Sequence, residues 1–240
     1  MNYPQAIKNW LLDLIFPIRC LNCQKFGQYL CPKCLNQIPL KQSFECIGCK
    51  QRVFLGQTCR FCLKENYLDR LLVAADYKNL LVEKTIKIFK FKFVAELSVP
   101  LSALMKKYIR QLQKKNKFNI FSENPILIPV PIHKRRENWR GFNQSKLLAK
   151  LLADIFQMEH APDVLTRIKN TAPQADIKER AERMENIKSV FGCHNPAKIS
   201  DRSILLIDDV CTTGATLNEC AMVLKDYGAK SVIALVLARG

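Results

Sequence analysis

The feature that most constrains the fold is a short apolar run that ends in two adjacent carboxylates and a hydroxyl-rich loop. It reads Ile204-Leu-Leu-Ile-Asp-Asp-Val-Cys-Thr-Thr-Gly-Ala-Thr-Leu217. The four apolar residues predict a buried strand, and the pattern after the glycine predicts a helix. In a parallel sheet, such a strand delivers Asp208 and Asp209 to the carboxyl edge, where open α/β folds bind ligands.

The loop after the acidic pair has the composition of a phosphate site, because it offers backbone N–H groups and three hydroxyls at a helix N-terminus. This threonine loop consists of Thr212, Thr213, Gly214, Ala215 and Thr216. Carboxylates accept hydrogen bonds from sugar hydroxyls, so the segment predicts a ribose 5-phosphate clamp with Asp208 and Asp209 as candidate catalytic residues. An ordinary capped helix is the plainer alternative, but it leaves the acidic pair unexplained. A Walker-type loop is excluded because no lysine follows the glycine.

The same segment resembles the signature of type I phosphoribosyltransferases, which bind phosphoribosyl pyrophosphate. The resemblance implies that the two carboxylates hold the 2′ and 3′ hydroxyls of the ribose and that the threonine loop holds the 5′-phosphate. It also implies that Mg²⁺ accompanies the pyrophosphate as a cofactor.

Eight of the eleven cysteines form four Cys-x-x-Cys pairs before residue 63. Eight thiolates suffice for two tetrahedral Zn²⁺ sites and leave no open position for catalysis, so both ions are expected to be structural. Disulfides fit poorly with a cytoplasmic chain, and four redox pairs in so short a stretch would be odd, whereas iron–sulfur ligation is not excluded by spacing. Sequential and interleaved pairing are both open. The predicted ligands are Cys20, Cys23, Cys31, Cys34, Cys46, Cys49, Cys59 and Cys62.

A second predicted strand, residues 125–131, runs into a basic loop. Arg136 and Arg140 stand four residues apart in this loop, and Asn143 and Gln144 open the next predicted helix. Arginine forks suit a pyrophosphate, so these four residues are candidate pyrophosphate ligands. The plainer alternative is an exposed basic loop with Asn143 as a helix cap.

The net charge of +17 predicts a polyanionic partner, either nucleic acid or a phosphorylated ligand. A solvated, lysine-rich surface is the alternative. Phe89, Phe91 and Phe93 alternate with the lysines and are expected in the core rather than as stacking platforms for bases. The candidate nucleic-acid ligands are Lys87, Lys90, Lys92 and Arg135.

Alternating strands and helices predict an open parallel α/β sheet with helices on both faces. We expect strands near 71–77, 125–131, 164–165, 203–207 and 232–237, and helices near 80–92, 94–116, 142–157, 178–189 and 215–227. The chain then divides into an N-terminal helix with a double zinc ribbon, residues 1–66, and a phosphoribosyltransferase-like domain, residues 67–240. No secretory signal or membrane-spanning run is evident, so we expect a cytoplasmic chain without membrane insertion.

Four features in this order resemble the ComF family, which is tied to natural transformation. They are the double ribbon, "IPVPIH…R…RGFNQ" at 128–144, "T..Q..I.....R..N....F" at 171–191 and "LLIDDVCTTGATL". The resemblance implies a phosphoribosyl pyrophosphate pocket and a role with single-stranded DNA, alongside a competence ATPase or helicase. Two functions stay open, a binding module that assists DNA uptake and an active phosphoribosyltransferase of nucleotide or base metabolism that releases pyrophosphate. The acceptor is not identified.

Overall fold

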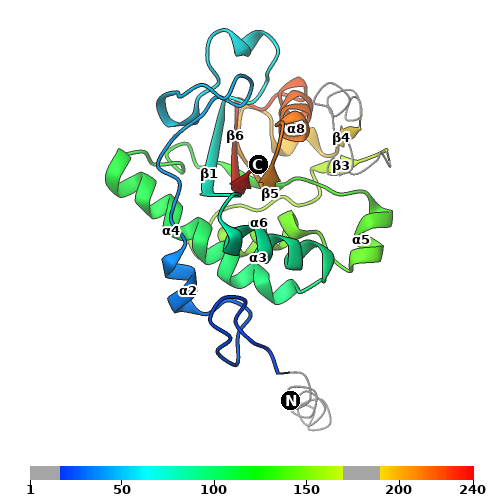
Figure 1. Cartoon of the computed structure of the whole chain (residues 1–240). Coiled ribbons are helices and arrows are strands. Elements are labelled where there is room, and N and C mark those ends of the chain that lie inside the picture. The colour runs from blue at the N-terminus through cyan, green and yellow to red at the C-terminus, as the bar shows by residue number, and fades with distance from the viewer. Residues whose placement is uncertain (1–16, 170–189) are drawn as a thin grey trace.

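The computed structural model of the chain, described at residues 17–169 and 190–240, contains a four-stranded parallel sheet (Figure 1). The strand order is β1-β6-β5-β2, and all three pairings are parallel. The strands are β1 (Arg70–Asp76), β2 (Ile126–Pro129), β5 (Ser203–Cys211) and β6 (Ser231–Arg239). The predicted open parallel sheet is therefore confirmed.

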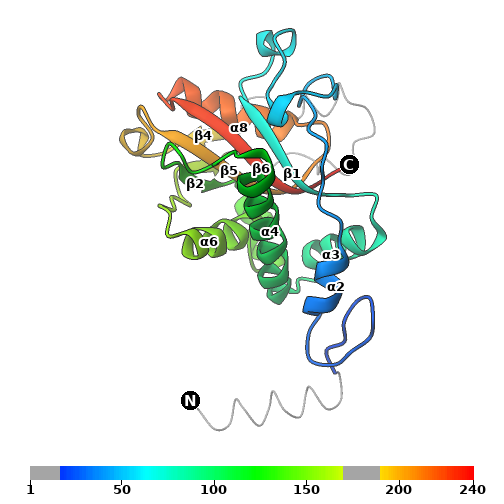
Figure 2. The ribbon, with the colours of Figure 1, turned by 90° about the vertical axis from the view of Figure 1, so that its left-hand side faces the viewer.

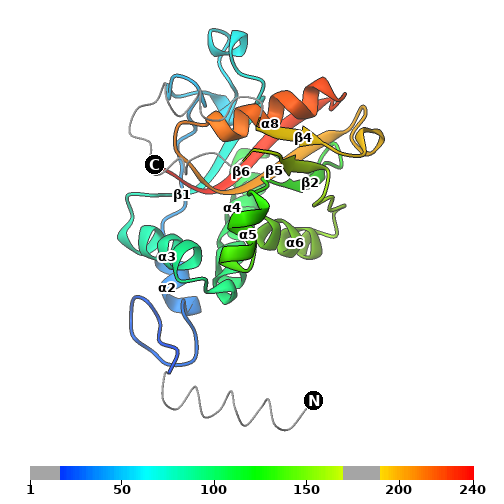
Figure 3. The same cartoon turned by 90° about the vertical axis from the view of Figure 1, so that its right-hand side faces the viewer.

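Helices cover both faces of this sheet (Figure 3). One face is covered by α3 (Leu80–Phe91), α4 (Ser98–Asn116) and α6 (Gln144–Phe156), and the other by α8 (Ala215–Asp226). Each face has its own hydrophobic cluster, because central strands with apolar residues on both sides must be covered twice. The helices begin where the sequence supplies caps: the Asn79 side chain accepts hydrogen bonds from the backbone N–H groups of Leu81 and Val82.

Shorter elements complete the fold. An antiparallel pair, β3 (Leu165–Arg167) and β4 (Phe191–Cys193), lies on the α8 side. Two short helices, α2 (Pro32–Gln37) and α5 (Lys134–Arg140), join the larger elements. Single 3₁₀ turns occur at Phe54–Gly56, Cys62–Lys64, Ala95–Leu97 and Pro196–Lys198.

Three local expectations were wrong. The segment expected to be a basic loop contains α5, because the His133 ring accepts a hydrogen bond from the Arg135 N–H and Gly141 ends the helix with a φ of 83°. Strand β5 extends past residue 207 and includes both aspartates. Strand β4 was not predicted. The expected helices at 1–18 and 178–189, and the motif residues 171–186, lie largely or wholly outside the described residues.

The two cysteine modules lie on different sides of the sheet (Figures 1 and 2). We call residues 20–34 the first ribbon and residues 46–62 the second ribbon. The first ribbon packs into the hydrophobic cluster of α3, α4 and α6 through Leu30 and Cys34. The second ribbon sends Ile47 into the cluster of α8. Within 17–169 and 190–240, no helix combines the length and apolarity needed to cross a membrane.

Candidate functional site

The two carboxylates lie near the carboxyl end of β5, where alternate side chains face opposite sides of the sheet. Asp208 is partly exposed. Its carboxylate accepts hydrogen bonds from the Ser145 hydroxyl at 2.7 Å and from the Asp209 backbone N–H at 2.9 Å. Asp209 is buried, and its carboxylate pairs with the Lys90 ammonium at 2.8 Å. The two acids are therefore held by different partners and are not equivalent.

The pKa of Asp208 is raised from its ordinary 3.8 to about 7. Burial is the largest cause and the neighbouring Asp209 adds to it, while Lys90 and Ser145 act in the opposite direction. A proton on Asp208 would occupy an oxygen that a sugar hydroxyl needs as an acceptor. Ligand binding that depends on this carboxylate is therefore sensitive to pH near neutrality.

We expect the chain to lose stability as the pH rises from about 4 to about 7, because folded Asp208 keeps a proton that the unfolded chain has already released. The contribution of Asp208 to the free energy of unfolding is fully present below about pH 4 and is lost as the pH rises through the pKa of the folded chain. Urea unfolding of wild type and Asp208→Asn between pH 4 and 8 isolates it. The two chains should differ in pH dependence within this window, and parallel curves would contradict the shifted pKa.

A cavity of about 220 Å³ opens beside the acidic pair at the carboxyl edge of the sheet. Its walls come from the ends of β1, β5 and β6 and from the start of α8, so it lies where parallel sheets bind ligands. The lining consists of Tyr77, Lys90, Phe91, Asp208, Val210, Cys211, Leu217, Gly240 and all five residues of the threonine loop. The structure thus brings the predicted carboxylates and the predicted phosphate loop together.

Gly214 is the turning point of the threonine loop. Its φ is +88°, a left-handed conformation that favours glycine, and α8 begins directly after it. The Thr213 hydroxyl accepts a hydrogen bond from the Ala215 N–H at 3.3 Å. The N-cap of α8 is nevertheless Gly214 and no side chain caps the helix, so the ordinary capped-helix alternative is not met, and all three threonines line the cavity.

The RGFNQ segment acts largely as a frame for the pocket. Asn143 is buried, caps α6 and donates a hydrogen bond to the Val130 carbonyl at 3.1 Å. The Arg140 guanidinium donates to the Gln144 side-chain oxygen at 2.6 Å. Burial lowers the pKa of Arg140, while Asp209 opposes this and Arg136 adds to it, so all three charges lie in one neighbourhood. Asn143 thus caps a helix, as the plainer alternative to a pyrophosphate ligand expected, and the two arginines lie near the acidic pair.

Arg167, at the end of β3, was absent from the predicted ligands. Burial lowers its pKa to about 10, with a further contribution from Arg136 and an opposing one from Asp208. A half-buried arginine near a carboxylate fits an anion site. Thr171 and Gln174, which follow Arg167 in the sequence, belong to a motif outside the described residues. Ser145 was also missed, because a serine one residue inside a helix carries no distinctive signal.

The four candidate nucleic-acid ligands lie in three different settings. Lys90 lines the pocket and pairs with Asp209, whereas Lys87 pairs with Glu83 at 2.7 Å. Lys92 and Arg135 are exposed. Among the phenylalanines, Phe89 is fully buried as expected. Phe91 and Phe93 are exposed, which corrects the expectation of a core position.

The eight paired cysteines form two clusters of four. The first holds residues 20, 23, 31 and 34, and the second holds 46, 49, 59 and 62; within each, the sulfur atoms lie within 4.8 Å of one another. Four convergent thiols at this separation fit a tetrahedral Zn²⁺. The pairing is sequential, which resolves the open alternative. Of the remaining cysteines, Cys211 and Cys220 are buried, as small core residues should be.

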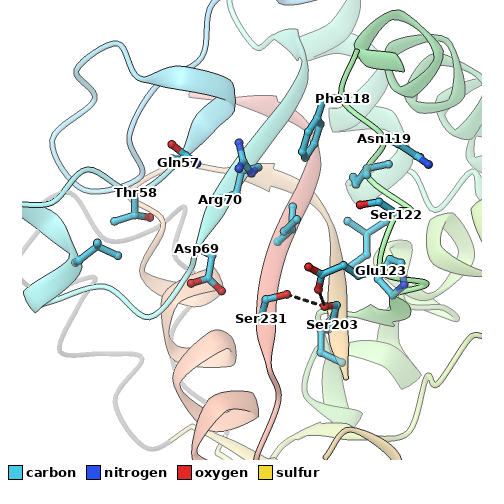
Figure 4. Close-up of a pocket in the computed structure, with 16 residues that line it drawn as sticks. Gln57, Thr58, Asp69, Arg70, Phe118, Asn119, Ser122, Glu123, Ser203 and Ser231 are labelled. Carbon is cyan, nitrogen blue, oxygen red and sulfur yellow. Dashed lines mark hydrogen bonds between the residues drawn. The ribbon is translucent and has the colours of Figure 1, made fainter. Parts of the chain in front are cut away.

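A larger cavity, about 510 Å³, lies at the opposite, amino edge of the sheet (Figure 4). Its polar side chains are largely committed to one another. The Ser231 hydroxyl donates to Ser203, whose hydroxyl in turn donates to Glu123, and Asp69 pairs with Lys225 at 2.6 Å. We therefore place the candidate site at the smaller cavity, where the acidic pair and the threonine loop converge.

Several known proteins are similar to this chain. Residues 144–240 match the phosphoribosyl transferase domain family. The chain is 29% identical to competence protein F of Haemophilus influenzae, over 93% of this chain and 98% of that protein. It is 28% identical to the DNA utilization protein YhgH of Escherichia coli K12, over 98% and 93%. It is 29% identical to the competence protein ComFC of Bacillus subtilis, over 92% and 88%.

These similarities run through both ribbons and the parallel sheet rather than through one motif. The matched domain contains the acidic pair, the threonine loop and Ser145. Asp208 and the threonine loop line the carboxyl-edge cavity, and Ser145 donates a hydrogen bond to Asp208. The fold, the cysteine clusters and the relatives named competence protein F and ComFC together support the assignment of this chain to the ComF family.

Proposed function

We propose that the carboxyl-edge pocket binds phosphoribosyl pyrophosphate or a related sugar phosphate, and that the protein uses it while handling single-stranded DNA during DNA uptake. The observation that carries the pocket is one cavity lined by Asp208, Lys90 and the threonine loop, with Asp209 paired to Lys90 at 2.8 Å. The DNA role is supported by relatives named for competence and for DNA utilization.

In this proposal the 5′-phosphate sits on the threonine loop, where backbone N–H groups at the start of α8 face it. The ribose hydroxyls donate hydrogen bonds to Asp208 and Asp209. Lys90, released from Asp209, can then turn to the pyrophosphate. Arg140 offers a further donor, because its buried Nε has no hydrogen-bond partner among the described residues. Bound Mg²⁺ would neutralise part of the pyrophosphate charge.

The test of the pocket is a calorimetric titration with phosphoribosyl pyrophosphate in the presence of Mg²⁺. We expect saturable binding at one site per chain. Ribose 5-phosphate should compete, since it keeps the phosphate and the hydroxyl groups, whereas ribose alone should compete poorly. Absence of binding by wild type would overturn the proposed pocket.

The second candidate function is pentosyl transfer in the same pocket. There the bond between the anomeric carbon and the pyrophosphate oxygen breaks as an acceptor adds to that carbon, and pyrophosphate leaves. Positioning by the acidic pair and electrostatic stabilisation of the leaving group would supply the catalysis. Pyrophosphate release with a panel of bases and DNA acceptors tests this, and its absence across the panel favours binding without turnover.

The surface beside the pocket supports contact with single-stranded DNA. The rings of Phe93 and Trp139 meet edge to face at 4.8 Å, and Trp139 is 66% exposed. Phe91 lines the pocket itself. Exposed aromatic rings next to the cations Lys92 and Arg135 offer stacking faces for bases and charges for the phosphate backbone, the usual combination for sequence-tolerant binding.

We expect Trp139→Ala to weaken binding of an oligothymidine about tenfold, since stacking on one aromatic ring contributes about 1–3 kcal/mol. Its slope of affinity against salt should stay that of wild type. Lys92→Gln and Arg135→Gln should each reduce that slope by about 0.7. Phe54→Ala is the matched control, because Phe54 is 73% exposed on the second ribbon. Equal losses for Phe54→Ala and Trp139→Ala in a fluorescence titration would contradict this surface.

The ribbons are proposed as docking modules for a partner such as the ATPase or helicase of the uptake machinery. Large apolar side chains on the second ribbon support this: Phe54 and Phe61 are each more than 70% exposed.

A further inference from the structure

The second ribbon touches the candidate pocket directly. Its first knuckle is Cys46-Ile-Gly-Cys49, so Ile47 lies between two predicted metal ligands. Ile47 is 1% exposed and belongs to the hydrophobic cluster of α8. It packs against the backbone of Gly214: a Cβ built on that glycine would lie 2.5 Å from Cγ1 of Ile47 and 2.8 Å from its Cδ1. Ile47 thus fills the space behind the turn of the threonine loop.

The knuckle is clamped from its other side by the last sheet strand. The Arg239 guanidinium donates hydrogen bonds to the carbonyl oxygens of Cys46 and Ile47, at 3.1 and 2.9 Å. Its side chain is only 3% exposed and also pairs with Glu45 at 3.5 Å. A buried guanidinium that depends on these carbonyls fixes the knuckle relative to β6, and Gly240 after it lines the cavity.

A third connection holds the helix that starts at the threonine loop. Asn218 is on the first turn of α8, and its side-chain oxygen accepts a hydrogen bond from the Tyr67 N–H at 2.6 Å. Its amide group donates to the Glu65 carbonyl at 3.2 Å. Both partners follow Cys62, the last ligand of the cluster, within five residues. The cluster is therefore bonded to α8 at one end and packed on Gly214 at the other.

We infer that the second ribbon is a positioning element of the sugar-phosphate pocket, and that metal at its four cysteines sets the conformation of the threonine loop through Ile47. This inference rests on the proposed function. A metal holds Cys46 and Cys49 in a fixed geometry, in which the Ile47 side chain reaches Gly214 while the carbonyl groups of Cys46 and Ile47 face Arg239. Without the metal, the backing of the loop is lost although every pocket side chain is still present.

The first ribbon provides the comparison. It packs against α3 and α4 on the other face of the sheet, and in the described part of the chain it supplies none of the residues that line the pocket. Its metal should therefore matter for local folding and leave the threonine loop unchanged. Cys23 and Cys49 are both exposed members of their clusters, so their serine variants form a matched pair.

The experiment measures the affinity of the zinc-loaded full chain for phosphoribosyl pyrophosphate and for ribose 5-phosphate. We expect Ile47→Ala to weaken both by about tenfold or more, because loose ligand positioning is costly, and Ile47→Val to recover most of the loss. Ile38→Ala is the control, since Ile38 is 3% exposed in the cluster of the other face. Cys49→Ser should bind one zinc fewer and lose affinity as Ile47→Ala does, whereas Cys23→Ser should lose one zinc and keep its affinity.

The outcomes are separable. If wild type does not bind either ligand, the proposed pocket fails. If wild type binds and Ile47→Ala and Ile38→Ala lose affinity equally, Ile47 acts through general stability and the inference is overturned. Equal affinities of Cys49→Ser and Cys23→Ser would overturn it as well, and zinc counts by mass spectrometry confirm that each variant lost the intended ion.

Discussion

The double variant Asp208→Asn, Asp209→Asn is expected to bind phosphoribosyl pyrophosphate about 10²–10⁴-fold more weakly than wild type. Each hydrogen bond from a sugar hydroxyl to a carboxylate contributes about 1.5–3 kcal/mol, and two such bonds are weakened at once. The change also removes the anionic partner of Lys90 at 2.8 Å. Isothermal titration calorimetry at constant Mg²⁺ measures the loss.

The control for this variant is Asp154→Asn, Asp163→Asn. It removes the same two charges from the surface, and each of these aspartates is also paired with a lysine, Lys150 or Lys146. Exposed ion pairs contribute little to the free energy of folding, so this control should stay folded and bind the ligand as wild type does. If the site variant stays within about threefold of wild type, a factor worth less than 1 kcal/mol, the acidic pair does not hold the ribose.

Removing zinc is the second change with a large expected effect. The chain should carry two zinc ions, and each structural site contributes an apparent 10–16 kcal/mol, about the whole stability of a small domain. The ribbons have few apolar residues of their own, so a strong chelator should expose the backbone amides of residues 20–62 to hydrogen exchange. Strands β1, β2, β5 and β6 are also covered by α3, α4, α6 and α8 and should exchange later.

Elemental mass spectrometry before chelation identifies the bound metal and counts the ions per chain. Two zinc per chain is the expected result. Iron with acid-labile sulfide would replace the zinc assignment, and one metal or none would contradict two four-cysteine clusters. A chelated chain whose residues 20–62 stay protected would show that the modules fold through their side chains alone.

Much of the site followed from sequence because its elements are local. The acidic pair and the threonine loop occupy nine consecutive residues, so a strand followed by a helix brings them together without help. The cysteine clusters are also local, since the two halves of each cluster lie within ten or so residues. The sheet followed from the alternation of apolar strands with amphipathic helices.

Contacts between distant segments could not be predicted. Lys90 and Asp209 are on elements far apart in sequence, and a lysine in a basic helix gives no sign that it turns inward. Phe91 is the last residue of α3 and stands about 200° around the helix axis from the buried Phe89, so it faces away from the core. Phe93 lies past the end of the helix and has a left-handed φ of 58°. Past the end of a helix, its periodicity no longer says which way a side chain points.

Strand order has a consequence for how the chain folds. Among the described strands, β1 pairs in the sheet with β6, and about 160 residues separate their partners, such as Leu71 and Ala234. Pairings of such long range form late, because a large loop must be closed first. The ribbons, by contrast, can bind metal as soon as their own cysteines are synthesised. Since Arg239 in β6 bonds to the second ribbon, we expect the late pairing of β6 with β1 also to fix that ribbon behind the threonine loop.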